Sequence, residues 1–260
     1  MTPAARLQCA VEALGEVEKS ISEQGAAADV LLKAFFRNRR YAGSGDRRAV
    51  FNRVYDVLRM RGYCLWACQE LDHVPSARNL MLVYLSLHDL EALDLFTAGL
   101  YGPPTLDSEE REFITMVQGL NLSDAPLWAH WNCSAAVAES LEKRFGGEAD
   151  EMRHALNERA SIDIRVNTQI TSAAELKQQF SDQDIIFDPC IHSPWGLRLQ
   201  GQRYLENHPF FKGGYFELQD EGSQITALLS AAAPGETVVD LCAGAGGKTL
   251  ALAAMMHNDG

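Results

Sequence analysis

The chain has 260 residues, with 23 lysines and arginines against 35 aspartates and glutamates, so its formal net charge is −12. Hydrophobic residues make up 47% and charged residues 22%, which is the balance of a globular protein and excludes collagen-like chains, mucin-like stalks and wholesale disorder. The apolar stretch closest to a membrane span, Ile225 to Ala233, falls short of the ~18 uninterrupted apolar residues such a helix needs.

The N-terminal segment from Met1 to Ala10 has a proline and an arginine but no apolar core, so no secretory signal is visible. We therefore expect a soluble, cytoplasmic protein with no membrane partner. Six cysteines are spread over the whole length, which in a reducing compartment favours free thiols over disulfides.

The first 160 residues repeat their apolar positions at helical spacing. One pattern runs from Leu7 to Ile21 and a second from Val30 to Phe35, with a break at Gly25 between them. Asp46 is the expected N-cap of a third helix. Later helices are expected after a capping box formed by Asp107 and Glu110, and over 134–145 and 148–160. These patterns predict an all-α bundle, and we place its domain at residues 1–145.

Cys64 and Cys68 lie four residues apart on one predicted helix face, with His73 nearby. A zinc site is conceivable there, but a single C-x-x-x-C without a second ligand pair is a weak signal. We favour two small buried side chains and predict no metal.

A basic segment stands out in this acidic chain. Residues 33–61 hold nine basic residues against two acidic ones, a local charge of +7. Arginine forks match phosphate oxygens, so the segment fits an RNA-binding surface; the alternative is a solvated helix face. The candidate RNA contacts within it are Arg37, Arg39, Arg40, Arg47 and Arg48.

The hydrophobic period changes after residue 160. Ile162, Ile164 and Val166 alternate with charged residues, which predicts a strand with one buried face. A short helix over 172–180 and apolar pieces at 185–187, 197–199 and 215–218 follow. We expect a small α/β linking domain at residues 146–212.

The last segment combines a helix over 221–233, stopped by Pro234 and Gly235, with a buried strand over 237–242 and a glycine-rich turn that leads into a helix through Met256. Glycines at 244, 246 and 247 permit positive φ and close approach of a ligand, and the free N–H groups at a helix start favour an anionic group. A nucleotide-like cofactor fits this turn.

Two cofactor classes compete for it. A phosphate-binding P-loop would need a glycine where Cys242 stands. An acidic residue followed by spaced glycines, here Asp240, Gly244 and Gly246, instead matches the turn of S-adenosylmethionine enzymes of Rossmann type. We favour methyl transfer.

Three segments resemble one family, the Sun (Fmu-type) RNA 5-methylcytosine methyltransferases of bacteria. The run from Asp240 to Thr249 (DLCAGAGGKT) is similar to the family's D-L-C-A-x-P-G-G-K-T, with Ala245 in place of the usual proline. The segment from Gly214 to Gln224 (GYFELQDEGSQ) resembles its G-x-F-x-x-Q-D-x-x-S-Q, and Arg165 to Asn167 its R-V-N strand.

The resemblance implies an α+β architecture: an N-terminal bundle similar to the antitermination factor NusB, a small α/β middle region, and the first strand, loop and helix of a Rossmann-type methyltransferase domain at 213–260. It implies S-adenosyl-L-methionine as cofactor and RNA, with ribosomal RNA favoured, as partner. Arg165 and Asn167 become weaker RNA-binding candidates. The cofactor-binding residues implied are Cys242, Ala243, Gly244, Ala245, Gly246, Gly247 and Lys248. For Gln219 and Asp220 we favour helix capping, with proximity to the cofactor pocket as a consequence.

The family's two catalytic cysteines lie downstream of its cofactor loop, and none of the six cysteines here replaces them. A thiolate must add to C6 of cytosine before C5 can attack a methyl group. We therefore assign no catalytic residue and expect the chain to be a truncated N-terminal part, inactive alone, that binds RNA better than cofactor. The alternatives are a non-catalytic RNA-binding module and a P-loop nucleotidase that depends on Lys248.

Overall fold

The computed structural model describes residues 1–201, 203 and 205–260. In this part the chain divides into two compact units, Met1–Glu158 and Arg159–Gly260. No helix of the described residues is long and apolar enough to cross a membrane.

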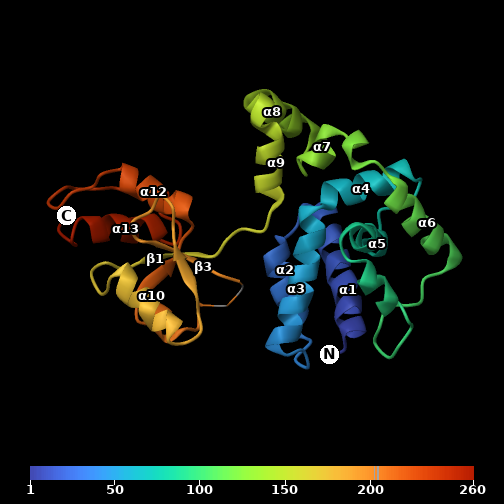
Figure 1. Cartoon of the computed structure of the whole chain (residues 1–260), viewed down its shortest axis with the longest axis horizontal. Coiled ribbons are helices and arrows are strands. Elements are labelled where there is room, and N and C mark those ends of the chain that lie inside the picture. Colours follow the sequence, from blue (N-terminus) through green and yellow to red (C-terminus); the bar gives the residue numbers. More distant parts are fainter. Residues whose placement is uncertain (202, 204) are drawn as a thin grey trace. The chain divides into compact units, whose positions relative to one another are not determined.

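The first unit is all helical (Figure 1). Its helices are α1 Pro3–Ser22, α2 Ala28–Arg37, α3 Ser44–Arg59, α4 Arg61–Glu70, α5 Ala77–His88, α6 Ser108–Gly119, α7 Leu127–His130, α8 Ala135–Phe145 and α9 Ala149–Asn157, with short 3-10 turns at Leu90–Leu95, Leu122–Asp124 and Gly146–Glu148.

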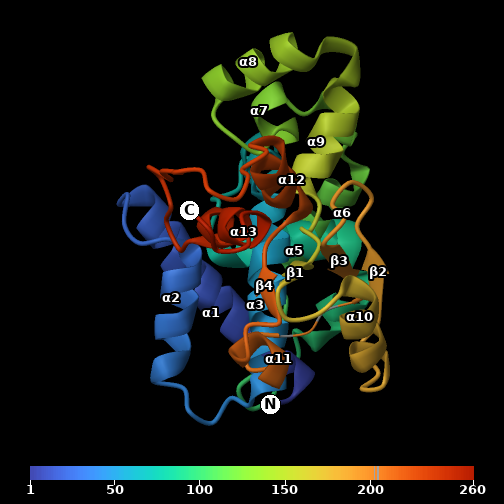
Figure 2. The same cartoon turned by 90° about the vertical axis from the view of Figure 1, so that its left-hand side faces the viewer.

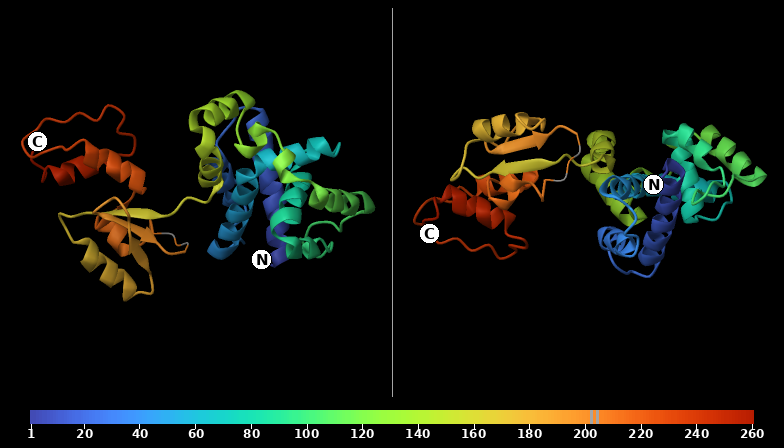
Figure 3. Two further views of the ribbon diagram at one scale, coloured as in Figure 1. Left: turned by 45° about the horizontal axis from the view of Figure 1, so that its top comes forward. Right: turned by 90° about the horizontal axis from the view of Figure 1, so that it is seen from below.

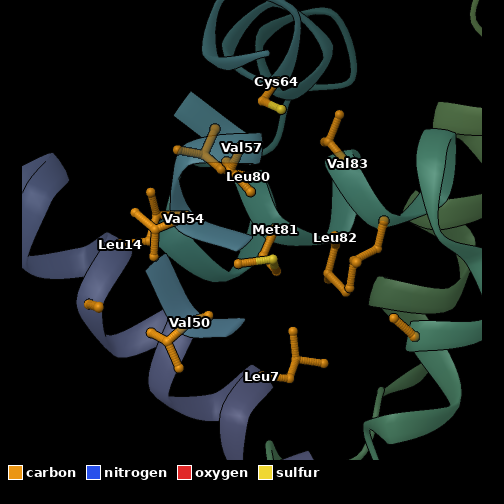
Figure 4. Close-up of a cluster of buried hydrophobic side chains, with 14 of the residues drawn as sticks. Leu7, Leu14, Val50, Val54, Val57, Cys64, Leu80, Met81, Leu82 and Val83 are labelled. Atoms are coloured by element: carbon orange, nitrogen blue, oxygen red, sulfur yellow. The ribbon is translucent and has the colours of Figure 1, made fainter. Parts of the chain in front are cut away.

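The core of this unit is built on α1, α3 and α5, whose apolar faces meet at the centre (Figure 4). Leu14, Val54 and Leu80 come from these three helices and are fully buried. Cys64 and Cys68 of α4 are fully buried in the same core, as expected, and burial raises the pKa of the Cys68 thiol to about 12. A smaller cluster around Trp131 joins α7, α8 and α9, which lie side by side (Figure 2).

Local signals predicted several helix starts in this unit. Asp107 caps α6, since its side chain accepts from the Glu110 N–H at 2.8 Å and Glu110 bonds back to the Asp107 N–H at 3.1 Å. The N-cap predicted at Asp46 is wrong by three residues, because α3 starts one turn earlier, after Gly43. Asp46 occupies the third helical position, where its carboxylate bonds the Gly43 N–H, Arg6 and the N-terminal amine.

The second unit is a mixed α+β unit with a four-stranded antiparallel sheet of order β2-β3-β1-β4 in the described residues. Its elements are β1 Asp163–Val166, α10 Ala173–Ser181, β2 Phe187–Pro189, β3 Gly196–Leu199, α11 Pro209–Lys212, β4 Phe216–Leu218, α12 Glu221–Leu229 and α13 Gly247–Met255. The helix α10 covers one face of the sheet, and α12 with α13 lies on the other (Figure 3).

The two sheet faces differ in chemistry. Ile164 and Val166 of β1 point into an apolar cluster with Leu176 and Phe180 of α10. The single buried face predicted for β1 is wrong, because Asp163 and Arg165 are only 5% and 3% exposed. Their face is covered as well, because Arg165 bonds Gln219, just before α12, and Asp163 accepts from the N–H of Glu221, the first residue of α12.

The observed boundaries differ from the three predicted domains at 1–145, 146–212 and 213–260. Residues 146–158 pack with the helical unit, where α9 contacts α8. Residues from 213 onward pack with the sheet, because β4 pairs with β1 through Ile164 to Leu218 and Val166 to Phe216. The strand β4 lies beyond the boundary predicted after residue 212 and pairs with β1 before it, so residues on both sides of that boundary form one unit.

The predicted strand over 237–242 does not form. This segment has no strand pairing, and Val239 and Leu241 are 73% and 91% exposed. A strand needs neighbours that accept its backbone hydrogen bonds and cover its side chains. The apolar run therefore stays unpaired, while the helix expected after the turn is present as α13.

Candidate functional site

The glycine-rich turn between Asp240 and Thr249 is closed by its own ends. The Thr249 hydroxyl donates to the Asp240 carboxylate at 2.8 Å, and the Gly246 N–H donates to the Ala243 carbonyl at 2.8 Å. Gly244 and Gly246 have φ of +56° and +87°. An L side chain rarely adopts this left-handed conformation, so both glycines are required by the turn itself.

The glycine-rich loop does not cap the N–H groups in the first turn of α13. Gly246 is the N-cap residue and has no side chain to accept from the helix. In the described part of the chain, the N–H groups of Gly247, Lys248 and Thr249 have no acceptor. Unsatisfied N–H groups and the helix dipole favour an anionic group at this point.

A pocket of about 290 Å³ lies beside this helix start. Its walls come from the turn, from Gln219 and Asp220 between β4 and α12, and from Ser223 in the first turn of α12. Of the predicted cofactor residues, Cys242, Ala243, Ala245, Gly247 and Lys248 line it. Gly244 and Gly246 do not line the pocket; they set the backbone conformation of the turn. The exposed Lys248 adds a positive charge, and Asp220 and Asp240 add carboxylates, so the pocket suits a ligand that carries both signs of charge.

The segment before α12 combines capping with support of the pocket. Asp220 is the N-cap of α12, and its carboxylate accepts from the Ser223 N–H at 2.9 Å, which confirms the predicted cap. Gln219 does not cap the helix. Its backbone carbonyl accepts from the Gln224 amide at 2.7 Å, and Gln224 in turn accepts from the Ser193 hydroxyl at 2.6 Å.

An ion-pair network supports the same region. The Arg198 guanidinium donates two hydrogen bonds of 2.8 Å to Asp163 and one of 3.4 Å to Glu221. Cys190 lies close enough to both carboxylates for the three side chains to surround an ion. Because Arg198 already neutralises them, we interpret the cluster as a structural network. Burial raises the pKa of the Cys190 thiol to about 11.

The two RNA-contact candidates Arg165, in β1, and Asn167, just after β1, are bonded inside the unit. Arg165 is buried, and its Nε donates to the Gln219 Oε1 at 2.7 Å. Asn167 is half-buried and its amide donates to the Gly214 carbonyl at 2.9 Å. Arg165 therefore offers RNA no surface, and we withdraw it from the proposed RNA contacts. The alternation that predicted an exposed face could not reveal the cover supplied by residues 219–224.

Most of the basic segment is paired within the helical unit. Arg39 bonds Glu12 at 3.2 Å and lies 3.5 Å from the Phe35 ring centre, and Arg47 donates to the Ala42 carbonyl at 2.9 Å. Arg48 is half-buried. Arg37 and Arg40 are exposed, and among the described residues neither forms an ion pair. These two guanidinium groups are the ones available to a phosphate backbone.

The remaining ion pairs of the segment join basic residues to acidic residues of other helices or of their own helix. They are Lys33 with Asp29, Arg53 with Asp89, Arg59 with Asp56, and Arg61 with Glu18. The local charge of +7 counted along the sequence is thus reduced in the fold.

The sequence placed Gln219 and Asp220 close to the cofactor pocket without naming them as cofactor-binding residues, and it omitted Ser223 and Asp240 from the predicted site. A signal was present, since Asp240 belongs to the turn motif and the other three to the segment from Gly214 to Gln224 that carries the family resemblance. What the sequence could not provide is the packing that brings these two segments together.

Comparisons with known proteins relate the chain to methyltransferases. Residues 137–206 match the family model described as Methyltr_RsmF/B-like, ferredoxin-like domain. The chain is 26% identical over 220 residues to a probable ribosomal RNA small subunit methyltransferase B of Synechocystis, with 83% of this chain and 48% of that protein covered. It is 35% identical over 89 residues to a 28S rRNA (cytosine-C(5))-methyltransferase of mouse, with 34% and 19% covered.

The crystal structure of PH0851 has the same fold, with a TM-score of 0.66 at 20% identity. The match covers 100% of this chain and 62% of the PH0851 chain. The predicted resemblance to the Sun (Fmu-type) RNA methyltransferases is thereby confirmed. The chain spans about half the length of the Synechocystis relative.

Proposed function

We propose that the chain is the RNA-binding and donor-binding part of an S-adenosylmethionine-dependent RNA cytosine-C5 methyltransferase that acts on ribosomal RNA in the cytoplasm. The turn of Gly244 and Gly246, with open N–H groups at the start of α13, is the observation that carries this proposal. It is supported by the rRNA methyltransferases among the relatives.

The residues of the pocket fit the donor. A carboxylate of the donor would face Lys248 and the N–H groups of Gly247 and Lys248, and its amine and sulfonium would face Asp220 and Asp240. When bound, S-adenosylmethionine supplies an electrophilic methyl group. The chain's own part is to bind and orient it, because none of its thiols is assigned as a nucleophile.

A second candidate is a non-catalytic RNA-binding module with a NusB-like bundle. One observation favours it: the pKa values of the Cys9, Cys64, Cys68, Cys133 and Cys190 thiols are all raised by burial. Raised pKa values leave little thiolate at neutral pH, and addition to C6 of cytosine needs a thiolate.

The donor part is tested by equilibrium dialysis of tritiated S-adenosylmethionine and of ATP against the 260-residue chain and its Lys248→Met variant. We expect retention of the methyl donor, reduced by the substitution, and no retention of ATP. ATP retention that depends on Lys248, with none of the donor, would support a nucleotidase and contradict the proposal.

The RNA part predicts that Arg37→Glu with Arg40→Glu lowers affinity for a small-subunit rRNA transcript and flattens its salt dependence. Each lost phosphate contact should reduce the slope of log affinity against log salt by about one. Fluorescence anisotropy over a salt series measures both quantities. Arg111→Glu with Lys143→Glu, an equal charge change at exposed sites on α6 and α8, is the control. An unchanged slope in the first variant would reduce the basic segment to a solvated surface.

A further inference from the structure

The side-chain amide of Gln219 is hydrogen-bonded through its oxygen, while its nitrogen has no partner among the described residues. Its Oε1 accepts from Arg165 Nε at 2.7 Å. An arginine nitrogen only donates, so the atom facing Arg165 must be the amide oxygen, and the amide nitrogen is turned away from it. The orientation of this buried amide, 8% exposed, is therefore set by Arg165.

The free side of the amide faces the glycine turn. A Cβ added to Gly247 would lie 3.7 Å from Gln219 Nε2, so the amide nitrogen sits against the first residue of α13. Gln219 also lines the pocket beside Lys248. In the part of the chain that the structure describes, Nε2 donates to no acceptor. An amide donor thus lies beside the open N–H groups of the helix start.

The burial of Arg165 costs the fold stability. It is 3% exposed, and no carboxylate lies within ion-pair distance of it in the described residues. Burial lowers its pKa, and Glu217 on the neighbouring strand only partly offsets this. A buried cation without an ion pair destabilises the fold, and its hydrogen bond goes to an uncharged side chain of the pocket wall. Proteins tolerate such departures from satisfied polar burial mainly at functional sites.

We propose that Arg165 is a positioning residue that holds Gln219 so that its amide nitrogen donates to a carboxylate oxygen of the ligand in the turn pocket. This inference rests on the proposed function, and it names the amino-acid end of the methyl donor as the part recognised. Lys248 and the open N–H groups of α13 complete a set of donors around that carboxylate. The pocket should therefore discriminate against a nucleoside thioether that lacks the amino acid.

The test is an NMR titration of the ¹⁵N-labelled 260-residue chain with two ligands at millimolar concentration. S-adenosylhomocysteine carries the amino acid, and 5′-methylthioadenosine lacks it. We expect S-adenosylhomocysteine to shift the Gln219 Nε2 resonances together with the backbone amides of Gly244, Gly246 and Gly247. 5′-Methylthioadenosine should leave the Gln219 side chain unshifted.

Gln219→Glu separates positioning from stability. The new carboxylate can pair with Arg165, so the unit should fold at least as well, yet it presents an acceptor to the pocket instead of a donor. We expect at least a tenfold loss of affinity for S-adenosylhomocysteine and no loss for 5′-methylthioadenosine. Gln118→Glu, the same change at an exposed position of α6, is the matched control. In Arg165→Met, the ratio of the affinity for S-adenosylhomocysteine to the affinity for 5′-methylthioadenosine should fall toward one.

The outcomes distinguish the inference from the function on which it rests. Shifts of the turn amides without a shift of Gln219, and unchanged binding by Gln219→Glu, would overturn the positioning role and leave the donor site standing. No shift of the turn amides with either ligand would overturn both.

Discussion

Replacing Arg198 by methionine is expected to destabilise the unit from Arg159 to Gly260 by about 3 kcal/mol, near the lower end of the ~3–5 kcal/mol for breaking a buried ion pair. Arg198 donates two hydrogen bonds of 2.8 Å to Asp163, whose side chain is 2% exposed. The low end applies because the Arg198 side chain is 40% exposed and solvent screens its charge. Hydrogen exchange of the β1 amides measures the loss.

The stability lost in Arg198→Met should depend on pH. Burial alone would raise the pKa of Asp163, but hydrogen bonds from Arg198 and from the Glu221 backbone hold that pKa below its usual value. The stabilisation is therefore complete above the unfolded pKa of about 3.9 and is lost as pH falls through the lower folded pKa. In Arg198→Met the pKa of Asp163 rises, so the deficit should be largest near neutral pH and shrink in acid.

The control for this prediction is the double variant Asp163→Asn with Arg198→Met. It removes the buried charge along with its partner, so part of the lost stability should return. A double variant as unstable as the sum of the single variants, or a deficit that does not change with pH, would show that Arg198 acts through packing and not through the ion pair.

Gly246→Val is expected to reduce donor binding by at least tenfold. Gly246 has φ of +87°, and the left-handed region costs an L residue about 1–2 kcal/mol, more for a β-branched side chain. A cost of about 1.4 kcal/mol is tenfold in affinity. The variant should relax the turn and move the open N–H groups of α13 away from the pocket, which equilibrium dialysis with S-adenosylmethionine detects.

The matched control is Gly119→Val at the end of α6. Apart from its chain neighbours and the backbone of its own helix, no atom of the described residues lies within 4 Å of the position where its Cβ would stand, and it lacks a positive φ. Its donor binding should equal that of the unchanged chain. If Gly246→Val retains the donor equally well, the turn does not shape the site and the proposed donor pocket is misplaced.

Elements set by short-range signals could be predicted from the sequence. The capping box at Asp107 depends on neighbours a few residues away, and the apolar pieces expected at 197–199 and 215–218 coincide with β3 and β4. The segment over 237–242 has the composition of a buried strand, but strand formation depends on partners distant in sequence. In this structure it stays unpaired.

The candidate site was predictable only where one segment sufficed. The turn motif named the loop and Lys248, because the motif is continuous in sequence. Long-range contacts decided the rest: Arg39 pairs with Glu12, and Arg165 is covered by Gln219, 54 positions away. Such contacts pair Arg39 and bury Arg165, and no local pattern reports them.

The claim that the turn from Asp240 to Thr249 holds a methyl donor is tested most directly by ultraviolet cross-linking of tritiated S-adenosylmethionine to the 260-residue chain, followed by peptide mapping. We predict label in the peptide that contains residues 240–249, lost on addition of S-adenosylhomocysteine and retained on addition of ATP. Label confined to other peptides, or removed by ATP and not by S-adenosylhomocysteine, would contradict the account.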